Sequence, residues 1–138
     1  MSDTPCLCIK LRRAGQEIAK LYDNALAPSG ISVTQFSQLH AIRRLKTPSI
    51  GQLAADLHLD RSTLGRNVRT LEQKRLVEHA PGTDERTRVV KLTDKGRQAL
   101  RTATPRWQAT QDTLADKLGA EKRQMLVGLL DELESLAP

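Results

Sequence analysis

The sequence predicts a mainly α-helical fold with one small β-hairpin, and three observations support this prediction. Apolar residues recur at steps of three and four along most of the 138-residue chain, the spacing of one helical face. Ser32 with Gln35, and Ser49 with Gln52, have the form of capping boxes that begin helices. Residues 76–92 instead place β-prone residues on either side of turn-forming ones. One domain is expected, because a chain of this length fills one modest, mainly aliphatic core.

Four helices are expected in the first half of the chain. The first begins near Leu7 and ends before Pro28, which stops a helix. The second and third follow the two capping boxes, and the third ends near His58. Asp60 is a suitable N-cap for the fourth. Its inward-facing residues are expected to be Leu64, Val68 and Leu71. The third and fourth helices, joined by so tight a turn, are typical of a helix-turn-helix.

The second half of the chain is expected to form a hairpin and two further helices. Leu76 and Val77, and then residues 89–92, are β-prone, with turn chemistry at residues 81–84 between them. Thr93 can cap a long helix, in which Pro105 is expected to produce a kink. A leucine-rich helix follows near the end of the chain.

A helix-turn-helix followed by a hairpin predicts a winged helix with helical flanks. We expect a single domain over residues 1–138, in which about residues 30–101 form the winged-helix core. The helices within residues 1–29 and 102–138 are expected to need a partner surface, because their apolar faces extend beyond what so small a core can cover.

Charge follows the same division. The chain has 22 Lys and Arg against 16 Asp and Glu, a formal net charge of +6. Residues 43–101 contain 14 basic and 7 acidic residues, whereas residues 102–138 contain 4 basic and 6 acidic ones. A basic core with a more acidic flank favours binding to the DNA backbone, since contacts to phosphates release counterions. We therefore expect double-stranded DNA as a partner.

The expected outer face of the fourth helix has residue types that read DNA bases. Arginine can chelate guanine, asparagine can pair with adenine, and hydroxyl groups can reach bases or phosphates. These residues are Arg61, Ser62, Thr63, Arg66, Asn67 and Arg69. The alternative is an ordinary solvated face. The neighbouring helix-turn-helix and hairpin favour the interpretation as a DNA-reading helix.

Two segments resemble the multiple antibiotic resistance regulator (MarR) family, "LDRSTLGRNVRTLEQKRLVEH" and "DERTRVVKLTDKG". The resemblance covers nearly the whole chain, and its most specific part is a complete wing signature. That signature comprises Asp84, Arg86, Leu92, Thr93 and Gly96. The resemblance implies a cytoplasmic homodimer whose paired fourth helices enter successive major grooves. It also implies that Arg86 contacts the minor groove while Asp84 braces the wing. Arg88 is expected either to contact phosphate or to be an ordinary exposed residue.

The same resemblance implies a sequence-specific transcriptional regulator, a homodimeric repressor at a pseudo-palindromic operator whose half-sites lie roughly 10 base pairs apart. Residues expected to contribute to the dimer contact are Leu7, Leu11, Leu126, Leu129, Leu130 and Leu133. A non-specific DNA-packaging protein is the alternative, and the base-reading types argue against it. An enzyme is not expected, because no Gly-rich phosphate loop or Ser-His-Asp order is present.

Two alternatives are considered for the chemical signal that the regulator senses. Cys8 and Tyr22 are placed as in family members that sense organic hydroperoxides, with Cys6 as a neighbour, and a helix N-terminus favours the reactive thiolate. Packing in the dimer interface is the alternative role for Cys8. The other signal is a small aromatic or phenolic acid. Candidate pocket residues, or else ordinary surface, are Arg13, His40 and Arg43. The histidines and cysteines lack ligand spacing, so neither metal nor cofactor is expected. Without a long apolar run, no membrane association is expected.

Overall fold

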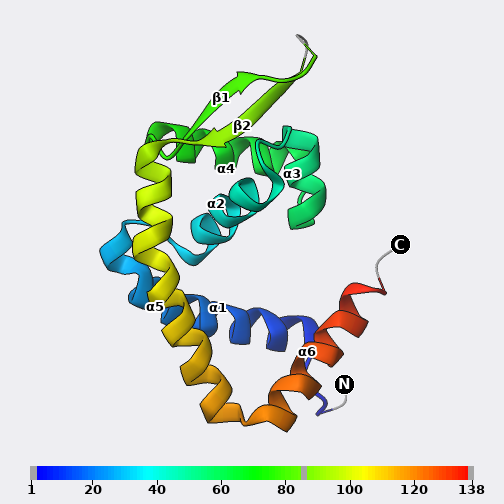
Figure 1. Cartoon of the computed structure of the whole chain (residues 1–138). Helices are drawn as coiled ribbons and strands as arrows, with labels where there is room; N and C mark the ends of the chain where they lie inside the picture. Colours follow the sequence, from blue (N-terminus) through cyan, green and yellow to red (C-terminus); the bar gives the residue numbers. More distant parts are fainter. Residues whose placement is uncertain (1–2, 85–86, 137–138) are drawn as a thin grey trace.

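The computed structural model describes residues 3–84 and 87–136, and it is mainly helical with one antiparallel hairpin (Figure 1). This confirms the predicted fold class. In chain order the elements are α1 (Leu7–Leu26), the 3-10 turn η1 (Ala27–Ser29), α2 (Val33–Leu45), α3 (Ile50–Leu57), α4 (Arg61–Gln73), β1 (Val77–Pro81), β2 (Arg88–Leu92), α5 (Asp94–Leu118) and α6 (Ala120–Glu134).

Both predicted capping boxes are present. The Ser32 hydroxyl oxygen accepts a hydrogen bond from the Gln35 backbone N–H at 3.2 Å, and the Gln35 side-chain oxygen accepts from the Ser32 N–H at 3.0 Å. At the start of α3, the Ser49 hydroxyl and the Gln52 backbone N–H lie 3.1 Å apart, with the reciprocal bond at 2.9 Å. Each box satisfies two backbone N–H groups at a helix start, which fixes where α2 and α3 begin.

The hairpin pairs Val77 with Leu92 at one end and Pro81 with Arg88 at the other. The sequence analysis placed Pro81 in the turn, but it is the last residue of β1, where a missing N–H leaves no ladder bond unmade. The sequence analysis also missed a third segment beside β2. The backbone N–H of Val90 donates to the Pro48 carbonyl at 2.8 Å, so the α2–α3 connection continues the sheet.

The hydrophobic core lies between α2, α3, α4, the base of the hairpin and the first half of α5. It includes the three predicted inward-facing residues of α4, which are almost fully buried. Among the largest fully buried side chains are Leu26, Leu39, Ile42, Leu53, Leu64, Val68, Leu71, Val90 and Leu100. Aliphatic burial of this kind holds α4 against the core and turns its polar residues outward.

The remaining helices form a separate lobe below this core in Figure 1. α5 leaves the hairpin, continues through Pro105 as one helix and packs against α1, while α6 folds back from its far end. Only Tyr22 and Leu26 of α1 are buried, and no residue of α6 is. The apolar faces of the two terminal helices are therefore uncovered within a single chain.

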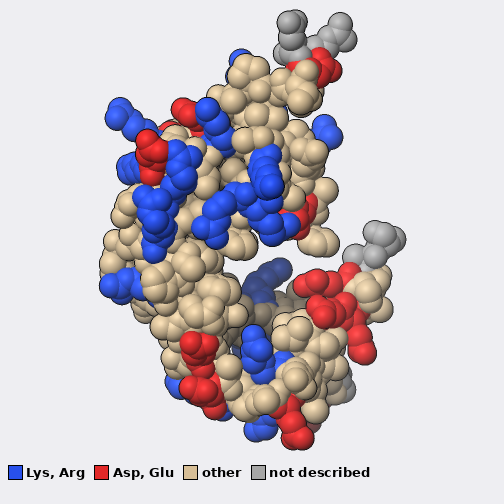
Figure 2. Space-filling model, viewed as in Figure 1, with Lys and Arg blue, Asp and Glu red and all other residues tan. Residues whose placement is uncertain are grey.

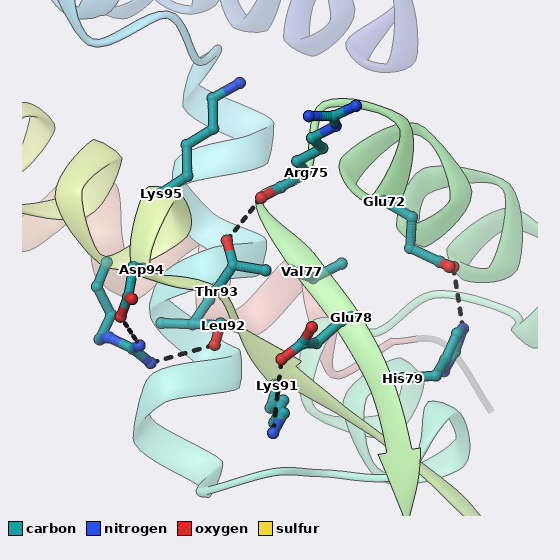
Figure 3. Close-up of a pocket in the computed structure, with 11 residues that line it drawn as sticks. Glu72, Arg75, Val77, Glu78, His79, Lys91, Leu92, Thr93, Asp94 and Lys95 are labelled. Atoms are coloured by element: carbon teal, nitrogen blue, oxygen red, sulfur yellow. Dashed lines mark hydrogen bonds and ion pairs between the residues drawn. The ribbon is translucent and has the colours of Figure 1, made fainter.

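The last part of the wing signature joins the hairpin to α5. The Thr93 hydroxyl donates to the Arg75 carbonyl at 2.6 Å (Figure 3). It also accepts from the Gly96 N–H at 3.0 Å, which caps α5. The Thr93 N–H donates to the Leu76 carbonyl at 3.1 Å. A Cβ at Gly96 would lie only 2.1 Å from that carbonyl oxygen, so the backbones meet where a side chain has no room. Thr93 and Gly96 are thus structural residues.

Candidate nucleic-acid interface

α4 begins at a dense local hydrogen-bond network around Asp60. The Asp60 carboxylate accepts from the Thr63 N–H and from the Ser62 hydroxyl, each at 2.7 Å, and from the Thr63 hydroxyl at 3.0 Å. These bonds, the backbone one foremost, lower the pKa of Asp60 to about 2. The two hydroxyl groups therefore offer DNA their lone pairs, because their protons already point to the carboxylate.

Because the pKa of Asp60 is lower in the folded chain than the ordinary 3.8, its capping contribution is complete above about pH 4 and is lost as the pH falls through about 2. We expect the melting temperature of the native protein to exceed that of Asp60→Asn at neutral pH and the gap to narrow between pH 4 and pH 2. Thermal unfolding followed by circular dichroism measures both. The asparagine variant retains a capping oxygen without the charge. A gap that stays constant down to pH 2 would contradict the assignment.

The arginines of α4 lie on its outer side. Arg61, Arg66 and Arg69 are exposed, and Asn67 is half-buried between them and the core. Within the described part of the chain, Arg66 makes only a long 3.5 Å contact, from a guanidinium nitrogen to the Thr63 hydroxyl. Their guanidinium groups are therefore accessible to an anionic partner, and this arrangement suits both base and phosphate contacts.

Two backbone hydrogen bonds extend the hairpin beyond its paired strands. The Gly82 N–H donates to the Thr87 carbonyl at 2.7 Å, and the Thr87 N–H donates to the Asp84 carbonyl at 2.9 Å. Arg88 is exposed at the start of β2. Arg86, the predicted minor-groove residue, lies outside the described residues. The described part of the wing thus places Asp84 and Arg88 at its outer end.

A cavity of about 750 Å³ lies at the base of the wing, between α4, both strands and the start of α5 (Figure 3). Its walls hold polar side-chain contacts between neighbouring elements. His79 Nε2 lies 2.9 Å from a Glu72 carboxylate oxygen, which joins β1 to α4, and Lys91 Nζ lies 3.5 Å from Glu78 across the hairpin. The lining contains both acidic and basic side chains, so it presents no single charge to a ligand. These residues instead hold the wing against α4.

Basic residues gather on the lobe that contains the winged helix, and acidic residues are prominent on the lobe formed by the terminal helices (Figure 2). This spatial division matches the excess of basic residues in 43–101. A polyanion approaching the molecule is therefore drawn to the winged-helix lobe.

The candidate redox residues are not brought together within one chain. Cys6 and Cys8 are free and exposed at the start of α1. Tyr22 lies 14 residues beyond Cys8 on the same helix, a separation of roughly 21 Å. Its hydroxyl donates to the Gln111 side chain, and burial raises the pKa of Tyr22, so the phenol stays protonated. Tyr22 thus joins α1 to α5 and does not reach its own chain's thiol.

The candidate effector residues are divided between two helices. His40 and Arg43 lie on α2, and partial burial, followed by the charges of Arg43 and Arg44, lowers the pKa of His40. Arg13 is exposed on α1. His40 stacks on Phe36 with ring centroids 6.1 Å apart, and Phe36 stacks on the α5 tryptophan at 5.5 Å. An aromatic row therefore adjoins two of the three predicted residues.

Sequence reasoning missed Gln38, which is only 2% exposed on α2. Its side-chain nitrogen has no hydrogen-bond partner among the described residues. It lines a cavity of about 330 Å³ between the first turns of α2 and the α3–α4 turn. The signal was local, because Gln38 shares a helical face with Ala41 and Ile42, three and four residues on. A glutamine on an otherwise apolar helical face is the sequence signal for such a buried polar residue.

No helix within residues 3–84 and 87–136 has the length and apolar character needed to cross a membrane. Over the same ranges, histidine, cysteine and acidic side chains form no group of three or more that could bind a metal ion.

Comparison with solved structures finds relatives along almost the whole chain. The M. tuberculosis transcriptional regulator MosR, solved in complex with DNA, is 34% identical, with a TM-score of 0.82, over 97% of this chain and 100% of that one. A mutant MarR from E. coli, complexed with operator DNA, is 27% identical over 92% of both chains, with a TM-score of 0.83. The transcriptional repressor CouR, bound to a DNA duplex, is 25% identical over 94% of this chain and 92% of that one, with a TM-score of 0.83.

Fold and surface together define a winged-helix, DNA-binding regulator of transcription. The MarR family model matches residues 29–87, while no curated protein sequence matches the chain. The chain belongs to the MarR family of transcriptional regulators. Members of this family are regulators and not enzymes, in agreement with the sequence analysis.

Proposed function

We propose that this chain is a homodimeric repressor that binds a pseudo-palindromic operator and releases it in response to a chemical signal. The observation that carries the proposal is the outer face of α4, where exposed arginines oppose a fully buried apolar face. The relatives solved with DNA support it, since two of them are 27% and 34% identical to this chain.

We assign base contacts to Arg66 and Asn67, with Ser62 and Thr63 accepting hydrogen bonds from base amino groups beside the helix start. Arg61 and Arg69 are assigned to phosphates or guanine. In the wing, Arg86 is assigned to the minor groove, Asp84 to bracing the turn and Arg88 to phosphate. Residues of about 30–101 would form the DNA-binding part.

The dimer part of the proposal rests on what we call the terminal stripe, the exposed large apolar residues of α1 and α6. Its members are Leu7, Ile9, Leu11, Ile18, Leu21, Met125, Leu126, Val127, Leu129, Leu130 and Leu133. Exposed large apolar residues gathered on two helices mark a protein interface. A second copy of the chain would cover it with the same residues, since a two-fold interface is self-complementary. Residues 1–29 and 102–138 would thus be the dimerisation helices.

Fluorescence anisotropy of labelled DNA from upstream of the protein's own gene tests the proposal. We expect Arg66→Ala and Asn67→Ala each to weaken binding by roughly 10- to 100-fold at fixed salt, because each removes a base contact. Arg106→Ala is the matched control, since Arg106 is exposed on α5 in the terminal lobe. Unrelated DNA should compete poorly with the specific duplex. Equal competition, with unchanged binding by both variants, would instead indicate a non-specific DNA-packaging protein.

For the signal, thiol oxidation has the support of exposed cysteines on the helix that carries half of the terminal stripe. A hydroperoxide would transfer one oxygen atom to the Cys8 thiolate, giving a sulfenate, and would leave as the alcohol. A polar sulfenate beside the stripe would alter the geometry of the dimer, and Cys6 would tune the reaction.

We expect hydroperoxide treatment to release DNA from the native protein and not from Cys8→Ser, measured by the same anisotropy assay. Cys6→Ser should remain responsive. If oxidation leaves DNA binding unchanged, the proposed signal is instead the alternative class, a small aromatic or phenolic acid. Benzoate then serves as the probe for binding at Arg13, His40 and Arg43, because the exposed His40 ring stacks on Phe36 beside Arg43.

A further inference from the structure

The side chain of Arg61 lies across the first turn of α3. A Cβ built on Gly51 would be 2.8 Å from Arg61 Nη2, 3.3 Å from Cζ and 3.5 Å from Nε. Three atoms of one guanidinium therefore lie within van der Waals reach of this single point. Arg61 follows Gly51 by ten residues and belongs to the next helix, so the contact joins the two halves of the helix-turn-helix.

The guanidinium of Arg61 has no hydrogen bond or ion pair among residues 3–84 and 87–136, and the side chain is exposed. No carboxylate therefore fixes its direction, and its N–H donors are all available. Arg44 on α2, by contrast, forms an ion pair with Asp56 on α3. Packing against the α3 backbone at Gly51 is the contact that the structure gives Arg61.

The electrostatic setting of this guanidinium is unfavourable without an anion. The start of a helix carries partial positive charge, and α3 has no acidic residue in its first turn. A DNA phosphate or a guanine edge would relieve that repulsion. Glycine within a helix also lowers helix stability relative to alanine, and Gly51 lies in a helix of only 8 residues. Glycine at residue 51 therefore does not stabilise the fold.

We propose that Gly51 is a positioning residue for DNA binding, because its missing side chain lets the Arg61 guanidinium lie close against α3, from where it faces the DNA. A methyl group at residue 51 would push the guanidinium off this seat. This inference rests on the proposed function, which takes Arg61 as a DNA contact.

The test compares Gly51→Ala, Arg61→Ala and the double variant as full-length proteins by anisotropy with the same upstream DNA. Gly51→Ala should weaken binding by roughly five- to tenfold, and Arg61→Ala by roughly 10- to 100-fold. The double variant should bind no more weakly than Arg61→Ala alone, since the effect of Gly51 passes through Arg61. The slope of log affinity against log salt should fall by about one for Arg61→Ala.

The melting temperature distinguishes a positioning role of Gly51 from general structural damage by the substitution. The melting temperature of Gly51→Ala should equal or exceed that of the native protein, because alanine favours the helix. Gly15→Ala is the matched control, since a Cβ at Gly15 meets nothing within 4 Å on α1. It should leave DNA affinity unchanged.

Two results would overturn the inference while leaving the proposed function intact. One is native affinity in Gly51→Ala while Arg61→Ala binds weakly. The other is an equal loss from Gly51→Ala with and without Arg61, which would place the effect elsewhere. Native affinity in Arg61→Ala would overturn the inference as well. The affinity of Arg66→Ala would then decide whether α4 is the DNA interface.

Discussion

Replacing Gly96 with alanine should destabilise the protein by about 3 kcal/mol, the upper part of the usual range for overpacking. The new Cβ would lie 2.1 Å from the Leu76 carbonyl oxygen and 3.1 Å from its carbon. Backbone cannot move aside as a flexible side chain does, so α5 would separate from β1. The Thr93 cap and the hydrogen bond from Thr93 to Arg75 would weaken with it.

Urea unfolding followed by circular dichroism measures this loss as a lower midpoint. Gly65→Ala is the matched control, because Gly65 also lies in a helix and a Cβ there meets nothing within 4 Å. That variant should be as stable as the native protein or more so. An unchanged midpoint for Gly96→Ala would mean that the junction between α5 and the hairpin tolerates a side chain.

The variant Leu130→Glu should dissociate the proposed dimer and weaken operator binding by roughly 100-fold or more, because the linked second half-site is lost. Leu130 is 37% exposed on α6, and Leu126 and Leu133 flank it along the terminal stripe. A carboxylate placed between two apolar surfaces would be desolvated without a partner. Analytical ultracentrifugation gives the mass, and anisotropy gives the affinity.

A control for added charge is Gln124→Glu, which also adds one negative charge to α6. Gln124 is exposed and lies six residues before Leu130, roughly 120° away around the helix. This variant should remain dimeric and bind DNA normally. A dimeric Leu130→Glu with native operator affinity would exclude α6 from the interface between subunits.

Local patterns made most of the fold predictable. The capping boxes at Ser32 and Ser49, and the Asp60 cap, depend on residues three apart in sequence, so their bonds could be anticipated from spacing alone. The buried face of α4 followed from helical periodicity for the same reason. Its exposed face could then be assigned by subtraction.

Contacts between distant elements could not be predicted in this way. The hydrogen bond from Val90 to Pro48, the bond from Tyr22 to Gln111 and the seat of Arg61 on Gly51 each join residues on different elements. Their geometry depends on how the elements pack, and periodicity carries no information about that. Sequence reasoning therefore identified the exposed residues of α4 without showing what positions them.

α5 connects the two lobes as one continuous helix. It begins against the hairpin at Gly96 and ends beside α6, and its 25 residues span roughly 37 Å. A tilt of about 5° at the lower end would displace the upper end by about 3 Å, a geometric consequence of that length. In the proposed dimer, a small chemical change between the terminal helices would thus become a misalignment of both wings with the DNA, and no relay of side chains through the core is needed.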